Sequence, residues 1–204
     1  MLILVRHGRT AVNASGRLQG RADPPLDDTG MSQAEALREA LPEAASIITS
    51  PLLRARQTAE VLAVGRPVQV DGRWVELDYG DWDGLPLDGV PAAEWARWRL
   101  DPSYRPPGGE TLEECGARVR LACEELSERA RSEDVVVVSH VSPIKAAVAW
   151  ALGVGDESSW RMFLGVAAVC RVAVTDRGPS LRSFNEMGHL SAPSQSVSRR
   201  DSLR

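Results

Sequence analysis

The strongest constraint on the fold is a set of short apolar runs that recur along the chain with helix-like segments between them. Leu2 to Val5 and Val135 to Val138 contain no polar residue, which is typical of strands covered on both faces. Further strands are predicted over Ser46 to Thr49, Val68 to Val70, Val169 to Val174 and Leu181 to Phe184. A sheet built from such strands needs helices on both of its sides.

The segments between these runs carry apolar residues at helical spacing. The three clearest faces are Met31, Ala34, Leu37 and Leu41; Leu52, Ala55, Ala59 and Leu62; and Leu112, Cys115, Val119, Ala122 and Leu126. Buried strands that alternate with amphipathic helices predict an α/β fold, a three-layer α/β/α sandwich with a mainly parallel central sheet.

Two serine–proline pairs mark predicted helix starts. Ser50-Pro51 follows the second strand, and Ser142-Pro143 follows the strand over Val135 to Val138. Serine is a common N-cap, and proline fits the first helical position because it has no N–H to satisfy. We therefore expect a helix to begin at each pair.

Two segments do not fit the strand–helix pattern. Residues 8–28 are polar and rich in Gly and Pro, and we expect a loop there. Residues 86–107 are rich in Trp and Pro, and we expect a small helical cap with a short helix around Ala93 to Trp98. Residues 1–190 are predicted to form a single domain, and residues 191–204, without apolar periodicity, a mobile tail.

Composition excludes several classes of protein. The 204 residues carry a net charge of -4 with a pI near 5.5, which argues against a nucleic-acid or membrane-surface binder. There is no run of 18 apolar residues and no signal-peptide pattern. Cys115, Cys123 and Cys170 have no metal-ligand spacing, so we expect buried thiols in a reducing compartment, the cytoplasm.

Two of the three histidines directly follow predicted strands. His7 comes after the first strand and His140 after the strand over Val135 to Val138. Functional sites of open α/β sheets form beyond the carboxyl ends of the strands, so both rings are predicted to emerge at one edge. His189 has no such position, and we expect it to be structural.

Arginines are predicted at the same edge. Arg6 adjoins His7, and Arg54 lies in the first turn of the helix after the second strand. Helix N-termini add free N–H groups and positive potential there. Planar guanidinium groups match phosphate oxygens in pairs, so phosphate is the natural ligand.

A metal site is the competing interpretation of two histidines. Catalytic zinc usually needs three protein ligands, and neighbouring arginines would repel the cation. The chain has no HExxH pair and no acidic cluster beside these histidines, and Gly8 does not start a Walker-type phosphate loop. We therefore predict no metal ion and no other cofactor.

Leu4-Val5-Arg6-His7-Gly8-Arg9-Thr10, with Asn13 downstream, resembles the signature of the histidine phosphatase superfamily, the phosphoglycerate-mutase-like group. Five further blocks agree in order and spacing: LQGRADPPLDDTG, SPLLRARQTA, ELDYGDWDG, PPGGET and VVVVSHVSPIKA. The last block is also similar to phosphatases for α-ribazole phosphate. Each block alone is weak evidence for the family, but six blocks in the same order are specific to it.

The resemblance implies a role for each matching residue. His7 would be the nucleophile, Arg6, Arg54 and His140 would bind the phosphoryl group, and Glu76 would be the general acid. It also implies a substrate-binding set, which comprises Gly8, Thr10, Asn13, Gln19, Gly20, Glu110 and Val141.

We therefore predict a metal-independent phosphomonoester hydrolase that acts through a phosphohistidine on a small phosphorylated metabolite. The chain would work as a monomer or homodimer. A cofactor-dependent phosphoglycerate mutase is the first alternative, although the short interval from Gly84 to Gly108 favours a phosphatase. A phosphate-binding protein without turnover is less favoured, because pure binding does not need Glu76 as a general acid.

Overall fold

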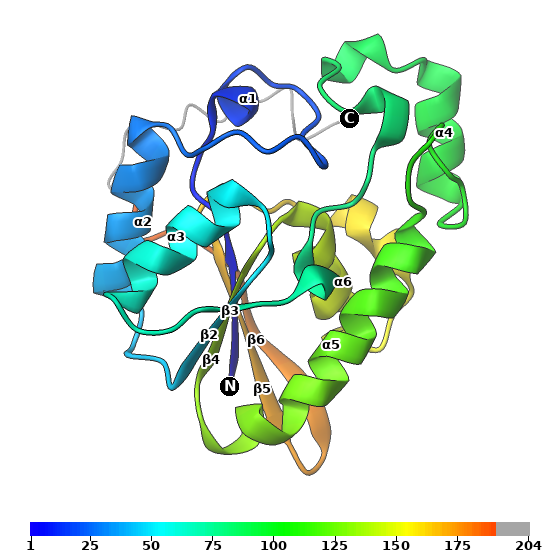
Figure 1. Ribbon diagram of the computed structural model, residues 1–204. Coiled ribbons are helices and arrows are strands. Elements are labelled where there is room, and N and C mark those ends of the chain that lie inside the picture. The colour runs from blue at the N-terminus through cyan, green and yellow to red at the C-terminus, as the bar shows by residue number, and fades with distance from the viewer. Residues whose placement is uncertain (191–204) are drawn as a thin grey trace.

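The computed structural model describes residues 1–190, which contain one six-stranded sheet (Figure 1). Its order is β3-β2-β4-β1-β5-β6, and β3, β2, β4 and β1 pair in parallel while β5 runs antiparallel to β1 and β6. The strands are β1 (Leu2–Arg6), β2 (Ser46–Thr49), β3 (Gln69–Val70), β4 (Val135–Ser139), β5 (Val169–Thr175) and β6 (Gly178–Glu186). The predicted mainly parallel sheet is confirmed.

Helices cover both faces of this sheet, and the alternation along β1 shows why. Leu2 and Leu4 belong to the core beneath α5 and α6, whereas Ile3 and Val5 belong to the core beneath α2 and α3. The four helices are α2 (Asp28–Ala40), α3 (Leu53–Ala63), α5 (Leu112–Ser132) and α6 (Val141–Leu152). The α/β/α sandwich is therefore confirmed, and Figure 1 shows its three layers.

The predicted N-cap of the helix after β2 is wrong. α3 begins at Leu53, and its N-cap is Leu52, which has no side-chain acceptor for the helix. The Asp23 carboxylate, from the loop before α2, accepts the Leu53 N–H at 2.6 Å. The Ser50 hydroxyl is bonded to the His140 ring and accepts the N–H of Leu52, the residue before α3, at 3.3 Å, so it caps no N–H of the helix itself.

The predicted N-cap of the helix after β4 is also wrong. α6 begins at Val141 with His140 as its N-cap, so Ser142 and Pro143 lie inside the first turn. The first N–H groups of the helix are satisfied by the carboxylate of Glu76, which comes from a distant loop. A cap supplied from another segment cannot be recognised in local sequence.

The two irregular segments contain short helices. The predicted loop over residues 8–28 includes α1 (Ala11–Ala14), and the predicted cap contains α4 (Ala92–Leu100) at the upper right of Figure 1. The remaining turns are 3-10 helices over Gly72–Trp74, Gly80–Trp82, Leu87–Gly89 and Asp156–Arg161. Residues 191–204, predicted to form a mobile tail, lie outside the described residues.

Candidate active site

His7 lies immediately past the carboxyl end of β1. Its backbone N–H donates to the Ser139 carbonyl at 3.0 Å, so the ladder with β4 holds it in place. The ring is almost fully buried, and Nδ1 lies 2.7 Å from the Gly8 carbonyl oxygen. Because a carbonyl only accepts, Nδ1 carries the proton and Nε2 holds the lone pair of the neutral ring.

His140 lies past the end of β4, the strand that pairs with β1. Its ring centroid is 5.0 Å from that of His7, with an interplanar angle of 60°. Nε2 is bonded to the Ser50 hydroxyl at 2.7 Å, whereas Nδ1 is buried without a partner among residues 1–190. Two histidines 133 positions apart in the chain thus form one pair of rings.

Arg54 joins this pair from the first turn of α3. It is fully buried, and its Nε donates to His7 Nε2 at 3.2 Å. Its two terminal nitrogens donate to the carbonyl oxygens of Ala22 and Gly20 at 2.7 and 2.8 Å. Within the described part of the chain, no carboxylate lies within ion-pair distance of this guanidinium.

Arg6, the last residue of β1, supplies a second guanidinium without a carboxylate partner in the described residues. Its Nη1 donates to the Leu164 carbonyl at 2.7 Å, and its Nε is buried and unpartnered. Burial lowers the pKa of Arg6 to about 10, and the charge of Arg54 acts in the same direction while Glu76 opposes it. Among the described residues, neither guanidinium of the site therefore makes an ion pair with a carboxylate, although Glu76 is near enough to act on the pKa of both.

Burial, with the same charges, keeps the imidazoles neutral. Burial, followed by the charges of Arg54 and Arg6, lowers the pKa of His7 well below its usual range. Burial also lowers the pKa of His140, and the neighbouring His7 and Arg54 add to the effect. A neutral His7 is the form that can act as a nucleophile.

Three buried side-chain nitrogens of the predicted site residues lack partners among the described residues. They are Arg6 Nε, His140 Nδ1 and Gln19 Nε2. Buried polar groups are normally hydrogen-bonded, because an unpaired donor costs free energy. Unpartnered donors beside uncompensated guanidiniums are typical of a site built for an oxyanion.

Glu76 lies almost fully buried at the N-terminus of α6. Its Oε1 accepts the N–H groups of Ser142 and Leu77 at 3.0 and 2.8 Å, and its Oε2 accepts that of Val141 at 3.0 Å. These bonds fix the carboxyl group beside His140 and leave one lone pair on Oε2 for a proton. The geometry is compatible with the predicted acid role, which stays a prediction.

Thr10, Asn13 and Gln19 form one hydrogen-bonded unit at the start of α1. Thr10 and Asn13 make a reciprocal capping box, and the Thr10 hydroxyl donates to Gln19 Oε1 at 2.8 Å. The unit leaves the Gln19 amide nitrogen without a partner in residues 1–190. Substrate binding by these three residues stays a prediction.

Gly8 and Gly20 stand where backbone segments meet. A Cβ on Gly8 would lie 2.4 Å from the Gly30 carbonyl oxygen, and one on Gly20 would lie 2.8 Å from that of Leu77. Their own carbonyls hold the His7 and Arg54 side chains. Both glycines therefore position the site through the backbone.

Two predicted substrate-binding residues have their polar groups engaged by the protein. The Val141 N–H is bonded to Glu76, as described above. The Glu110 carboxylate is held by Arg118 Nε and Nη2 at 2.7 and 2.9 Å. Contact of either residue with a substrate stays a prediction.

Sequence analysis missed several residues that support the site. Ser50 holds His140, Asp23 caps α3, and Asp83 accepts the N–H groups of Gly20 and Ala22. Asp83 lies in the ELDYGDWDG block, so the sequence identifies its motif. It does not identify the backbone N–H groups that Asp83 accepts. These contacts join loops that are distant in sequence.

Residues 1–190 contain no group of three or more His, Cys, Asp or Glu side chains placed to hold a metal ion. None of the described helices has the length and apolar character needed to cross a membrane. Cys115, Cys123 and Cys170 are all buried and unpaired, and the expectation of buried thiols is confirmed. His189 Nε2 is bonded to the Ala167 carbonyl at 3.0 Å, and the Ala167 N–H donates to the His7 carbonyl, so His189 contacts the backbone partner of His7 rather than its ring.

The fold and the site define an α/β protein with a neutral, buried histidine that lies beside a second histidine and a buried guanidinium at the carboxyl edge of its sheet. The family model of the histidine phosphatase superfamily (branch 1) matches residues 2–187, and the chain belongs to this superfamily. The family predicted from the six sequence blocks is thereby confirmed.

The chain is 35% identical over 200 residues to a bifunctional protein of Mycobacterium tuberculosis, covering 93% of this chain and 54% of that protein. It thus spans about half the length of the first curated relatives it matches. It is 33% identical to phosphoserine phosphatase 1 of Hydrogenobacter thermophilus, with 93% of both chains covered. A structure of an Entamoeba histolytica phosphoserine phosphatase mutant with phosphoserine superposes with a TM-score of 0.87 at 25% identity, covering 93% of this chain and 98% of that one.

Proposed function

We propose that the protein hydrolyses phosphomonoesters of small metabolites through a phosphohistidine on His7, without a metal ion. The observation that carries the proposal is the His7 ring, whose Nδ1 is tied to the Gly8 carbonyl so that Nε2 keeps its lone pair beside two uncompensated guanidiniums. Phosphatase names among the relatives support the same reaction class.

In the first step, the lone pair of His7 Nε2 attacks phosphorus and the bond from phosphorus to the ester oxygen breaks. The Arg54 Nε–H, which donates to His7 Nε2 in the free site, turns to a phosphoryl oxygen. Glu76 gives its proton to the departing oxygen, and the alcohol leaves. Oriented donors and fixed cations stabilise the charge that spreads over the phosphoryl oxygens.

In the second step, water attacks the phosphohistidine and the bond from phosphorus to nitrogen breaks. Glu76, now a carboxylate, takes the proton of the attacking water and is ready for the next cycle. Inorganic phosphate leaves, and His7 regains its lone pair. Arg6 and the free Nδ1 of His140 supply donors in both steps.

The test is to trap the intermediate. Wild-type protein quenched during turnover of a substrate labelled in its phosphoryl group should carry acid-labile label on His7, and His7→Ala should carry none. Phosphate release by His7→Ala should fall by about 10⁴-fold or more, as with other nucleophile deletions. Near-normal turnover by this variant would refute the mechanism.

A second measurement distinguishes hydrolysis from mutase activity. A mutase must retain the phosphoryl group and return it to the bound intermediate, whereas a hydrolase releases phosphate. Interconversion of 3- and 2-phosphoglycerate measured beside phosphate release would show which dominates. We propose hydrolysis, because residues 86–107 add only one short helix, α4, and a 3-10 turn beside the site.

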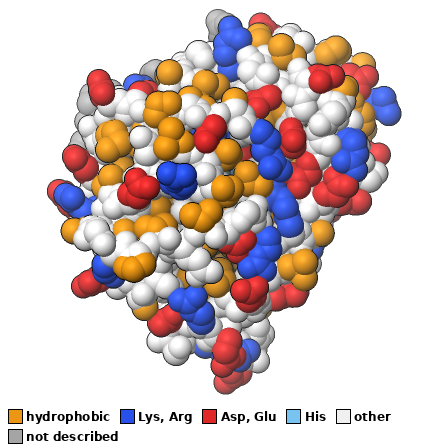
Figure 2. All heavy atoms as spheres, viewed as in Figure 1, with side chains coloured by type: hydrophobic (Ala, Val, Ile, Leu, Met, Phe, Trp, Pro, Cys, Tyr) orange, Lys and Arg blue, Asp and Glu red, His pale blue; other side chains and the backbone are white. Residues whose placement is uncertain are grey.

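The proposal includes a cytoplasmic location, no nucleic-acid or membrane partner, and a monomer or homodimer. Buried, unpaired thiols favour a reducing compartment. On the face in Figure 2, basic and acidic side chains are interspersed, which does not favour a polyanion partner. Cell fractionation and analytical ultracentrifugation would test location and assembly.

A further inference from the structure

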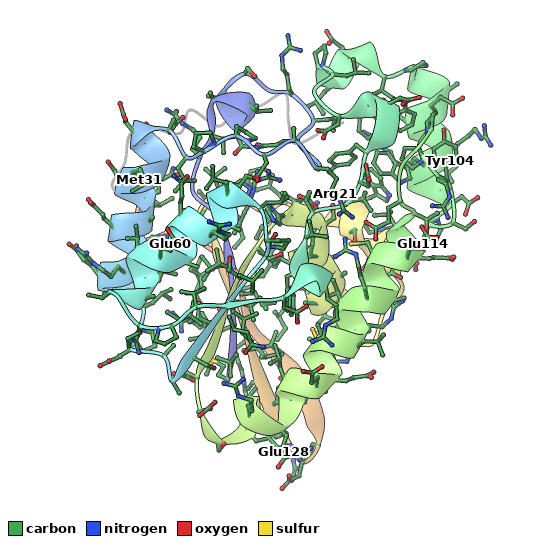
Figure 3. All side chains as sticks on the ribbon, viewed as in Figure 1. Arg21, Met31, Glu60, Tyr104, Glu114 and Glu128 are labelled. Carbon is green, nitrogen blue, oxygen red and sulfur yellow. The ribbon has the colours of Figure 1, made fainter. Side chains whose placement is uncertain are left out.

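Ser50 is a fully buried serine to which the chemistry proposed above gives no role. It follows the last residue of β2, and its backbone N–H donates to the Val138 carbonyl at 3.0 Å, which continues the ladder between β2 and β4. His140 follows the end of β4, and its Nε2 lies 2.7 Å from Ser50 Oγ. In Figure 3, side chains fill the region between α3 and α6, above the ends of these strands.

The hydroxyl of Ser50 has two hydrogen-bond partners among residues 1–190. A serine hydroxyl has one proton to donate and two lone pairs that accept. One lone pair of Ser50 Oγ accepts the Leu52 N–H at 3.3 Å, and His140 Nε2 is the second partner. The bond between Ser50 and His140 runs in one of two directions, and the direction depends on which ring nitrogen of His140 carries the proton.

The number of unsatisfied groups favours one direction. If Ser50 donates to His140 Nε2, only the Nδ1–H of the ring is left without a partner among the described residues. If His140 donates to Ser50 instead, two groups are left, the Ser50 O–H and the Nδ1 lone pair. Each buried polar group without a partner costs free energy, so the first arrangement is the more stable one. His140 then keeps its lone pair on Nε2 and its proton on Nδ1.

The two rings of the site thereby acquire opposite properties. The Gly8 carbonyl accepts the proton of His7 Nδ1, so His7 has its lone pair at Nε2. The Ser50 hydroxyl donates to His140 Nε2, so His140 has a free N–H at Nδ1. The ring centroids are 5.0 Å apart. One ring is therefore prepared to attack phosphorus, and the other is prepared to donate a hydrogen bond to an oxygen of the same phosphoryl group.

The other tautomer of His140 would oppose this chemistry. A lone pair on Nδ1 would repel the negatively charged phosphoryl oxygens, because both groups are hydrogen-bond acceptors. Burial lowers the pKa of His140 well below its usual range, and the charges of Arg54 and Arg6 add to the effect, so the ring carries a single proton. The position of that one proton decides whether His140 attracts or repels the phosphoryl group.

We propose that Ser50 is a positioning residue that fixes the proton of His140 on Nδ1 and so makes this ring a hydrogen-bond donor to the transferring phosphoryl group. The inference rests on the proposed function, because it assigns the group that prepares one of the residues in that mechanism. Ser50 acts only through Nε2 of His140. The Nδ1 proton stays on His140 in both steps, and no bond to Ser50 forms or breaks apart from this hydrogen bond.

The tautomer itself can be measured in the free protein. Proton–nitrogen correlation NMR on protein with isotope-labelled histidine, above the usual histidine pKa of about 6.5, distinguishes the ring nitrogen that carries the proton from the one that carries the lone pair. Of the three histidine signals, that of His140 is the one that His140→Asn removes. In the wild type its proton should lie on Nδ1. A proton on Nε2 in the wild type would overturn the proposal.

Two substitutions of Ser50 should then move the proton and restore it. In Ser50→Ala the proton of His140 should lie on Nε2 in a large share of the molecules, because no hydroxyl holds a lone pair there. kcat/KM for p-nitrophenyl phosphate should fall by about 10- to 100-fold, as when the hydrogen-bond partner of a metal-binding histidine is removed. Inhibition by inorganic phosphate should weaken in parallel. Ser50→Thr keeps a hydroxyl and should recover both the Nδ1 proton and most of the activity.

Thr49→Val is the matched control. Thr49 is also fully buried, and its hydroxyl donates to the Ser50 carbonyl at 3.2 Å. Its replacement should leave the tautomer of His140 and kcat/KM at the wild-type values, and thermal melting of each variant shows that it is folded. A fall in kcat/KM of Ser50→Ala with the proton still on Nδ1 would overturn the proposal, because it would make Ser50 a purely structural residue. A shifted proton with unchanged kcat/KM would also overturn it.

Failure of this inference is distinguishable from failure of the proposed function. If wild-type protein hydrolyses p-nitrophenyl phosphate through a phosphohistidine but carries the His140 proton on Nε2, only the role of Ser50 is wrong. If it hydrolyses no phosphate ester and forms no phosphohistidine, the proposed function itself fails, and with it the role of Ser50 in phosphoryl transfer.

Discussion

Arg54 and Arg118 are both largely buried and both make several hydrogen bonds, but their partners differ. Arg118 contacts the Glu110 carboxylate with two nitrogens, whereas Arg54 contacts two carbonyls and a neutral imidazole. Burial lowers the pKa of Arg54 and outweighs the opposite effect of the more distant Glu76, Asp23 and Asp83. Burial acts on Arg118 too, but the hydrogen bond and charge of Glu110, with Cys115 and Glu76, together outweigh it and raise the pKa.

The difference separates a structural charge from a functional one. A buried cation paired with a carboxylate is compensated whether or not a ligand is present. A buried cation without one costs free energy in the free protein, and an incoming oxyanion relieves that cost. In the proposed mechanism, the guanidinium of Arg54 is therefore free to bind the phosphoryl group, while the ion pair of Arg118 and Glu110 holds two segments of the chain together.

Removing each charge in turn is the strongest test of the difference between Arg54 and Arg118. Arg54→Met should lower kcat/KM by about 10²- to 10³-fold or more, because a preorganised donor to the phosphoryl group is lost. It should also abolish the rise in melting temperature that saturating phosphate or vanadate produces in the wild type.

Arg118→Met should behave in the opposite way in the same two assays. It leaves Glu110 without its main partner and should reduce the free energy of unfolding by about 3 kcal/mol. The melting temperature should still rise with phosphate. If Arg118→Met loses the phosphate response and Arg54→Met keeps it, the assignment of the two groups is reversed.

Glu76→Gln tests the third charged element of the site. The amide oxygen can still accept the Ser142 N–H, the bond to the Val141 N–H is lost, and the amide cannot supply an acidic proton. Turnover of alkyl phosphates should fall by about 10²-fold or more, and that of p-nitrophenyl phosphate by much less, because its leaving group barely needs protonation. Equal losses for the two ester classes would argue against the acid role.

The pH response of His7 gives a smaller but direct measure of the neighbouring charges. Burial, Arg54 and Arg6 lower the pKa of His7. On acidification, kcat/KM should therefore begin to fall only below the usual histidine pKa of about 6.5. In Arg54→Met, NMR titration should show the pKa of His7 moved up toward its usual value. In Arg118→Met it should not move.

The same shift has a consequence for stability. The unfolded chain binds a proton at His7 and at His140 below pH of about 6.5, and the folded chain does not, because both pKa values are lowered. The free energy of unfolding should therefore fall as the pH drops through this range. Stability that rises on acidification from pH 7 to 6 would contradict the assignment of neutral, buried imidazoles.

The smallest effect is expected from metal removal. If the uncompensated guanidiniums supply the positive charge that phosphoryl transfer needs, dialysis against EDTA should leave kcat within about twofold of its starting value. Recovery of a lost activity by added magnesium or zinc would show that a metal ion shares this task.

Much of the fold follows from local sequence. The strands over Leu2 to Val5 and Val135 to Val138 were predictable because unbroken apolar runs fit only a sheet buried on both faces. The positions of His7 and His140 followed, since carboxyl ends of parallel strands meet at one edge. The family resemblance then suggested a role for Arg54 and Glu76.

Helix starts and loop contacts were not predictable in the same way. Ser50 and Ser142 both have the local pattern of N-caps, yet the structure uses Asp23 and Glu76, which come from other segments. A cap needs only an acceptor at the right point in space, and sequence does not say which distant loop will bring it.

By itself, the sequence determined the sheet, the helices on its faces, and the delivery of two imidazoles and two guanidiniums to one edge. Strand and helix periodicity are local properties, so these features can be predicted from short segments. Only the tertiary structure decided which charges are compensated. Arg54 meets carbonyl oxygens, whereas Arg118 meets the carboxylate of Glu110. These pairings depend on how loops cross above the sheet, and hydrogen-bond geometry of that kind is not encoded in any one segment.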